Sequence, residues 1–119
     1  MLNLPPNATF LFAQQPINMG LSFDGLLGLV RNTLGADPLS PTFFLFLNKR
    51  RDKIKVFYWD NDGFVIWYKR LEEGTFRLPL LVPAEDGAIH ITRAQLAMLL
   101  EGLDFTQGER RKRFSKKSA

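Results

Sequence analysis

The feature that most constrains this chain is the run FFLFLNKRRDKIKVFYWDNDGFVIWYKRL, which occupies residues 43–71. Three segments rich in Phe, Ile, Val, Tyr and Trp, which pack well on a pleated surface, are separated by two short polar stretches. The first stretch, 48–52, is charged and long enough to reverse the chain, and the second, 61–63, is Asn-Asp-Gly, whose residues tolerate left-handed backbone. The pattern predicts an antiparallel meander with strands at 43–47, 53–59 and 64–71.

The register of the second predicted hairpin decides which side chains share a face, because a slip of one residue moves every side chain to the opposite side. Two registers fit the sequence. A three-residue loop closed by Gly63 opposes Tyr58 to Ile66, whereas a two-residue loop of Asp62 and Gly63 opposes Lys55 to Arg70 and mixes charge into the aliphatic face. We favour the first register. It places Ile54, Val56, Tyr58, Phe64, Ile66 and Tyr68 on one face and Lys53, Lys55, Phe57, Trp59, Val65, Trp67 and Lys69 on the other.

Two other segments have the periodicity of helices. The first begins at Ser22, a good N-cap residue, and stops near Gly35. The second begins with Thr92 and Gln95, which are spaced as a capping box. The predicted buried positions are Phe23, Leu26, Leu27, Val30 and Leu34 in the first helix, and Leu96, Leu99, Leu100 and Leu103 in the second.

Shorter apolar runs complete the predicted fold. Residues 9–13 and 75–78 are short strand candidates, and an apolar pattern resumes at 89–91. The fold class is α+β: a small, twisted, mainly antiparallel sheet built on the meander, with the two helices packed against it. We expect a single α+β domain over residues 1–105 and a basic, disordered tail over residues 106–119.

Composition limits what such a domain can do. Of its 119 residues 45% are hydrophobic, enough for a packed core, and none is cysteine, which excludes disulfides and thiolate metal ligands. No apolar run approaches the ~20 residues of a membrane span, and no basic residue precedes an apolar segment at the N-terminus, as it does in a secretion signal. We therefore expect a cytoplasmic protein without a membrane partner or a cofactor.

The net charge of +4 is concentrated near the C-terminus. Six of the 16 Lys and Arg residues, but only one of the 12 acidic residues, lie within 106–119, so the rest of the chain is close to neutral. This distribution limits any general claim that the folded part binds nucleic acid. The six tail cations are Arg110, Arg111, Lys112, Arg113, Lys116 and Lys117.

Four blocks of the sequence are specific in their order and spacing. They are FDGLLGLV at 23–30, DPLS at 37–40, the segment 50–79, and ITRAQLAMLLEGLD at 91–104. In these blocks the chain resembles the TnpB-type accessory proteins encoded by the second reading frame of bacterial insertion sequences of the sixty-sixth family. Family members usually carry a basic pair after a Met at the start of the first block. In this chain that Met is Met19, and Gly20 and Leu21 follow it. The resemblance implies a part in transposition beside a separate, larger transposase, and it implies no catalytic residues.

The residues themselves do not suggest catalysis. The common transposases hold two metal ions with three carboxylates, whereas the acidic residues here fall at predicted turns and helix ends. His90, the single histidine, lies between two isoleucines in a strand pattern, where an edge or core role is more common than general base catalysis. We expect a protein that is not an enzyme and has no metal site.

Basic residues near aromatic residues are the strongest candidate contact site. Aromatic rings can stack on exposed bases while cations meet phosphates. We predict nucleic-acid contacts by Lys49, Arg50, Arg51, Lys53, Lys55 and Lys69 and by the six tail cations, with Phe57, Trp59 and Trp67 as an aromatic contact face. The same rings are equally suited to pack beneath the helices, and the charges to form a solvated hairpin tip, so the sequence leaves this choice open.

Two functions remain open on the sequence alone. In the first, the protein binds DNA at the ends of the element and helps to assemble the transposition complex. In the second, it is a protein-interaction module that binds and regulates the transposase of the same element without contacting DNA. No small-molecule substrate is evident from the residues.

Overall fold

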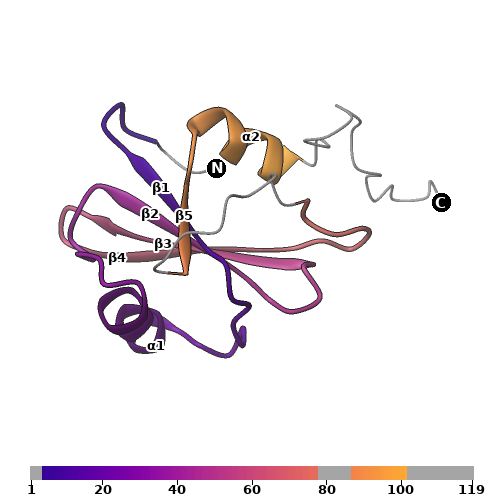
Figure 1. The fold of residues 1–119 in the computed structure, drawn as a ribbon, viewed down its shortest axis with the longest axis horizontal. Helices are drawn as coiled ribbons and strands as arrows, with labels where there is room; N and C mark the ends of the chain where they lie inside the picture. The colour runs from indigo at the N-terminus through magenta and orange to yellow at the C-terminus, as the bar shows by residue number, and fades with distance from the viewer. Residues whose placement is uncertain (1–3, 78–86, 102–119) are drawn as a thin grey trace.

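Five strands form one sheet in the structure, a computed structural model that describes residues 4–77 and 87–101 (Figure 1). In chain order they are β1 (Thr9–Ala13), β2 (Thr42–Leu47), β3 (Lys53–Asp60), β4 (Gly63–Arg70) and β5 (Ala88–Ile91). Across the sheet their order is β4-β3-β2-β1-β5. Strands β1 and β2 are parallel, and the other neighbouring pairs are antiparallel. The predicted α+β class and the mainly antiparallel sheet are confirmed.

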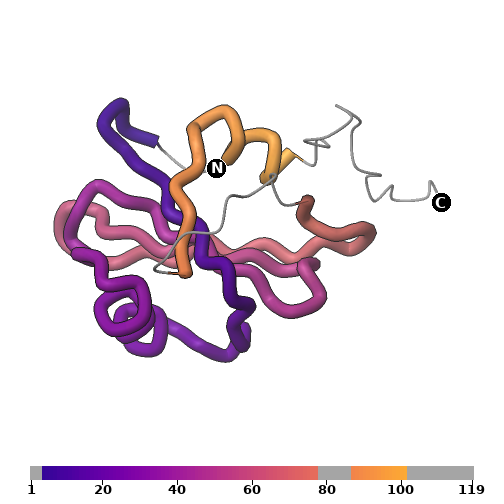
Figure 2. Tube along the Cα trace, viewed as in Figure 1, coloured from indigo at the N-terminus to yellow at the C-terminus, as the bar shows by residue number. Residues whose placement is uncertain are grey.

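Two helical segments lie on opposite faces of this sheet (Figure 1). Helix α1 (Phe23–Gly28) continues into η1 (Leu29–Thr33) within the connection that joins β1 to β2, and Figure 2 traces this path. Helix α2 (Arg93–Glu101) follows β5. Because both faces of the sheet are covered, β2 is buried at every position after Thr42 and reads as a continuous apolar run.

The sheet separates two apolar cores, since alternate residues of each strand point to opposite faces. The α2-side core comprises Phe10, Phe12, Phe43, Leu45, Leu47, Ile54, Val56, Phe76, Ile91, Leu96 and Leu99. The α1-side core comprises Leu11, Ala13, Leu26, Val30, Leu34, Phe44, Phe46, Phe57 and Ala88. Each helix therefore packs on its own layer, and the central strands contribute to both.

Helix α2 begins as the sequence predicts. The Gln95 amide donates to Thr92 Oγ1 at 3.0 Å, and the Thr92 amide donates to Gln95 Oε1 at 2.8 Å. These reciprocal bonds satisfy amides that the first turn of a helix leaves unpaired. Leu96 and Leu99 are buried, as expected, whereas Leu100 is only half-buried and Leu103 lies outside the described residues.

The first helix departs from its prediction at Phe23. Leu26, Val30 and Leu34 are buried as expected, but the Phe23 side chain is 48% exposed. The three buried residues are four apart, and the Leu34 amide donates to the carbonyl of Leu29, five residues earlier, in a π-helical turn. A wider turn keeps positions four apart on the same side of the helix. Phe23 lies in the α-helical part before this turn, three residues from Leu26 instead of four, and its side chain is outside the buried row.

Both ends of the first helix lie near the predicted residues. Ser22 occupies the N-cap position with extended backbone, although its side chain makes no capping hydrogen bond. At the other end Gly35 has a φ of +59°, and the amide of Ala36 donates to the carbonyl of Val30 at 3.0 Å. Glycine suits this left-handed position because it has no Cβ to clash with the backbone.

The short strand predicted at 75–78 is wrong for the part of it that the structure describes. Residues 75–77 are not in a strand, and Leu78 lies outside the described residues. Phe76 accounts for the apolar signal differently: its side chain is buried in the α2-side core, and its amide donates to the carbonyl of Arg51 at 2.7 Å. The segment that contains Phe76 is therefore hydrogen-bonded to the β2–β3 turn.

The register of the β3–β4 hairpin matches neither of the two registers considered from the sequence. Asp60 opposes Gly63, so the loop consists of Asn61 and Asp62, and Val56 opposes Trp67. The favoured prediction closed a three-residue loop with Gly63, but the loop ends at Asp62 and Asn61 takes the left-handed conformation, with a φ of +55°. Phe64, Ile66 and Tyr68 consequently share a face with Lys55, Phe57 and Trp59, and Val65, Trp67 and Lys69 share the other face with Ile54, Val56 and Tyr58.

Candidate nucleic-acid interface

Exposed cations gather at one end of the sheet. The β2–β3 turn, residues 48–52, carries three of them, and the last residues of β4 reach the same end because Arg70 opposes Lys53. We call this group the basic end. Its members are the exposed Lys49, Arg50, Arg51, Lys69 and Arg70 and the half-buried Lys53. Lys69 therefore lies at the same end of the sheet as the turn cations, but the observed register puts it on the opposite face from Lys53 and Lys55, with which it was predicted to share a face.

The side chain of Asn48 organises the β2–β3 turn. Its Nδ2 donates to Asp52 Oδ1 at 2.6 Å, while its Oδ1 accepts the amides of Asp52 at 3.1 Å and Lys53 at 3.0 Å. Asparagine is suited to this role because its side chain can imitate a backbone turn. The polar atoms of the turn are thus paired inward, while the side chains of Lys49 and Arg50 remain exposed.

The backbone of the β2–β3 turn also accepts hydrogen bonds from the segment that follows β4. Arg51 adopts a φ of +61°, an uncommon conformation for a residue with a Cβ. Its carbonyl accepts the amide of Phe76, and the carbonyl of Asp52 accepts the amide of Leu71 at 2.7 Å. The segment after β4 therefore holds the turn in one conformation, and the cations project from a fixed base.

Two carboxylates modify the charge of the basic end. The hydrogen bond from Asn48 lowers the pKa of Asp52 below its ordinary value, against the opposing effect of burial, with the charges of Arg50 and Lys53 acting in the same direction as the bond. Glu72 lies at the exposed surface, where its Oε1 accepts from Arg70 Nη2 at 2.7 Å and from Arg70 Nε at 3.0 Å. Lys49, Arg50 and Arg51 carry the projecting positive charge.

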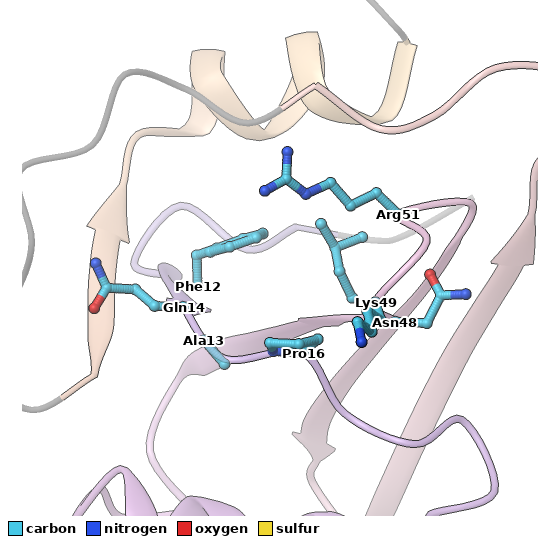
Figure 3. A pocket seen from close by; sticks show the side chains of 8 residues that line it. Phe12, Ala13, Gln14, Pro16, Asn48, Lys49 and Arg51 are labelled. Atoms are coloured by element: carbon cyan, nitrogen blue, oxygen red, sulfur yellow. The ribbon is translucent and has the colours of Figure 1, made fainter.

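A pocket of about 210 Å³ lies beside the basic end (Figure 3). It opens where the parallel strands β1 and β2 end, and Gln14 lies on the opposite side from Asn48, Lys49 and Arg51. Its lining residues are Phe12, Ala13, Gln14, Pro16, Leu47, Asn48, Lys49 and Arg51. The pocket thus joins an apolar floor to a cationic rim. Sequence reasoning missed it because the parallel pairing of β1 with β2 was not anticipated.

Lys55 was predicted to contact nucleic acid, but the structure buries it. It is 6% exposed, and its Nζ donates to the carbonyls of Met19 at 2.7 Å and Leu21 at 2.6 Å. The same Nζ lies 4.8 Å from the centre of the Tyr68 ring. Burial lowers the pKa of the Lys55 amine. Lys55 therefore anchors the loop that precedes α1 instead of meeting a partner.

The predicted aromatic contact face is divided by the observed register. Phe57 is fully buried in the α1-side core and stacks on Phe64, with ring centroids 4.9 Å apart. Trp59 packs edge-on against Phe64 at 5.0 Å, whereas Trp67 packs against the opposite core. Both tryptophans are half-buried, and they lie on opposite faces. Phe57, Trp59 and Trp67 therefore do not form one surface.

The remaining predicted contact residues lie outside the described part of the chain. They are the tail cations Arg110, Arg111, Lys112, Arg113, Lys116 and Lys117. Within the ranges 4–77 and 87–101, no group of three His, Cys, Asp or Glu side chains is placed to hold a metal ion. Those same ranges contain no helix long and apolar enough to cross a membrane. His90 is exposed on β5.

The described residues form a small α+β sheet structure with exposed cations gathered at one end. Residues 8–110 match the family model described as IS66 Orf2 like protein, and this chain belongs to that family of insertion-sequence accessory proteins. The match ends within the tail, so every tail cation except Arg110 lies beyond it.

Two relatives come from Sinorhizobium fredii (strain NBRC 101917 / NGR234). The uncharacterized protein y4jC is 37% identical over 101 residues, which cover 85% of this chain and 84% of the relative. The uncharacterized protein y4hO is 34% identical over 105 residues, which cover 88% of this chain and 89% of the relative. No solved structure matches the chain significantly.

Proposed function

We propose that this accessory protein binds DNA at the ends of its insertion sequence through the basic end of the sheet, and that it thereby helps to assemble the transposition complex. The observation that carries the proposal is the group of exposed cations on a turn whose own polar atoms are already paired. Cations on a preorganised turn lose little conformational freedom when they meet phosphates.

The pocket beside the basic end gives a bound nucleotide a place to enter the domain surface. Its volume of about 210 Å³ is several times the ~30 Å³ that one water molecule occupies in the liquid, so a phosphate and part of its sugar can enter. Lys49 and Arg51 at the rim supply positive charge for the phosphate, and the exposed Pro16 supplies apolar surface for the sugar. Ligands of open sheets commonly bind beyond the carboxyl ends of parallel strands, which is where this pocket lies.

The tail supplies a second electrostatic contribution in this proposal. Each phosphate that a cation neutralises adds about −0.9 to the slope of log affinity against log salt concentration, so full engagement of the tail contributes roughly −5. The basic end adds to that slope and fixes the orientation of the domain on the duplex. In this proposal the tail supplies nonspecific attraction to DNA, and the folded domain sets the position of the protein on the duplex.

Binding to an element-end duplex at several salt concentrations tests the role of the basic end. Arg50→Ala and Arg51→Gly should each make the slope shallower by about 0.9 and weaken binding. Glycine at position 51 also relieves the positive φ, so its folding stability should remain within about 0.5 kcal/mol of the wild type or rise. Arg31→Ala, which removes an exposed charge from η1, is the matched control and should leave the slope unchanged.

Two outcomes would overturn the proposal. If the Arg50 and Arg51 variants fold normally and keep the wild-type slope, as Arg31→Ala should, the basic end does not touch phosphates. If the wild-type protein binds the transposase but no DNA at low salt, the protein-interaction alternative is correct.

A further inference from the structure

Strand β4 has a long outer edge on which the described residues place no neighbouring strand. It is eight residues long and contains no proline, and its first six residues, Gly63 to Tyr68, include no charge. Alternate residues of an edge strand direct their N–H and C=O groups outward, which makes such an edge a template for another strand. At the other side of the sheet β5 has only four residues.

The side chains along this edge are apolar and only partly covered. Phe64, Val65, Ile66 and Trp67 are half-buried, and Tyr68 is 49% exposed. Protective devices that proteins commonly place on edge strands, such as inward-pointing charges and prolines, do not occur between Gly63 and Tyr68. A second strand beside β4 would therefore cover apolar surface as well as satisfy backbone groups.

The charges at the two ends of β4 indicate the kind of strand that fits. Asp60 and Asp62 flank its start, while Lys69 and Arg70 form its end. An antiparallel copy of the same strand brings the acidic start of each copy beside the basic end of the other. Opposite charges across neighbouring strands are favourable, and like charges directly opposite each other are not.

Pairing centred on Ile66 opposes aromatic, β-branched and oppositely charged residues at most positions of the strand. Because a two-fold axis normal to the sheet relates the copies, Ile66 faces its own counterpart and each residue faces one at equal distance from the centre. Phe64 then faces Tyr68, and Val65 faces Trp67, which are the aromatic and aromatic with β-branched pairs that stabilise sheets. Asp62 faces Arg70, whose guanidinium has enough donors to keep its bond to Glu72.

We propose that two copies of this chain associate through antiparallel pairing of their β4 strands about Ile66, forming one continuous sheet across the dimer. The basic ends of the two copies then lie at opposite ends of the continuous sheet. The pockets beside them stay away from the interface, because β3 and β2 separate each pocket from β4. Self-association depends on β4 alone and does not rest on DNA binding.

Sedimentation of the purified full chain, freed of nucleic acid, tests this pairing over a wide range of protein concentration. The wild type should pass from monomer to dimer as concentration rises. Asp62→Arg and Arg70→Asp each place like charges opposite each other at two symmetric sites, so each should raise the dimer dissociation constant about tenfold. The double variant Asp62→Arg/Arg70→Asp exchanges the charges and should restore dimerisation.

Asp24→Arg is the matched control, since Asp24 is an exposed acid on α1, and it should leave the dissociation constant unchanged. Both single variants alter exposed residues, so a normal thermal transition will show that they fold. A wild type that stays monomeric at every concentration would overturn the proposal, as would a dimer that all four variants leave equally stable. A monomer whose β4 amides become protected from hydrogen exchange only when transposase is added would instead assign the edge to the transposase.

Discussion

The two turns of the β2–β3–β4 meander differ in construction and in charge. The turn at 48–52 is held by the side chain of Asn48 and by backbone bonds from the segment after β4, and it carries three cations. The turn of Asn61 and Asp62 is short and exposed, and Asp60 and Asp62 make it acidic. The meander therefore presents opposite charges at opposite ends of the sheet. The difference suggests that the ends have different roles: the turn cations of the basic end meet phosphates, while the acidic turn lies beside Arg70 of a second copy.

The largest difference between the turns should appear when their asparagines are changed. Asn48→Ala removes three hydrogen bonds, one of them to a carboxylate, and should lower the free energy of unfolding by about 2–4 kcal/mol. Asn61→Gly, at a φ of +55°, should change it by less than about 1 kcal/mol. Urea denaturation measures both. Equal decreases in the free energy of unfolding would contradict the view that an asparagine side chain stabilises only the turn at 48–52.

Variants of Lys53 and Lys55, near the start of β3, should distinguish a cation that contacts DNA from one that stabilises the fold. Lys55→Met leaves the carbonyls of Met19 and Leu21 without their donor and should cost about 1–3 kcal/mol of stability. Lys53→Met should cost less than about 1 kcal/mol, because Lys53 is only half-buried and a partly solvated charge contributes little to folding. Denaturation gives the stability, and the same proteins can be titrated with DNA. A stable Lys55→Met variant that loses DNA affinity would return Lys55 to the contact surface.

A smaller effect should appear in the pH dependence of the basic turn. Since the pKa of Asp52 is lower in the folded protein than in the unfolded chain, the folded state binds fewer protons between the two values. The stabilisation from Asp52 is therefore complete above the ordinary pKa of an aspartate, and it is lost as pH falls through the lowered value. Asp52→Asn keeps an acceptor for Asn48 and should flatten this part of the stability profile. An unchanged profile would show that the charge of Asp52 does not stabilise the turn.

Most of the fold could be predicted because its signals are local. Runs of β-branched and aromatic residues gave the strands of the meander, and the capping box at Thr92 and Gln95 is formed as expected. The hairpin register failed because Asn and Gly both tolerate left-handed backbone, and the sequence 61–63 offers each of them as the turn residue. That single step moved Trp67 to the opposite face from Trp59.

The candidate site was less predictable because it depends on contacts between distant segments. The turn cations could be named from their clustering, but the burial of Lys55 follows from carbonyls more than thirty residues away, at Met19 and Leu21. The pocket requires β1 to lie parallel to β2, which no local pattern indicates. The spacing of Asn48 and Asp52 was the one available signal for the fastened turn, since an Asn at the start of a loop commonly bonds to the backbone that follows.

Residue-resolved NMR of the full chain, titrated first with itself and then with an element-end duplex, tests most directly whether the two ends have different partners. Addition of DNA should shift the amide signals of residues 49–53 and 69–70 and leave those of 60–64 unaffected. Raising the protein concentration without DNA should shift the signals of 62–70 and leave those of 49–51 unaffected. Residues 69–70 belong to both groups, so 49–51 and 62–64 discriminate between the two. If either titration shifts both 49–51 and 62–64, or if DNA shifts neither 49–53 nor 69–70, the division of the sheet into a DNA-binding end and a self-pairing edge is wrong.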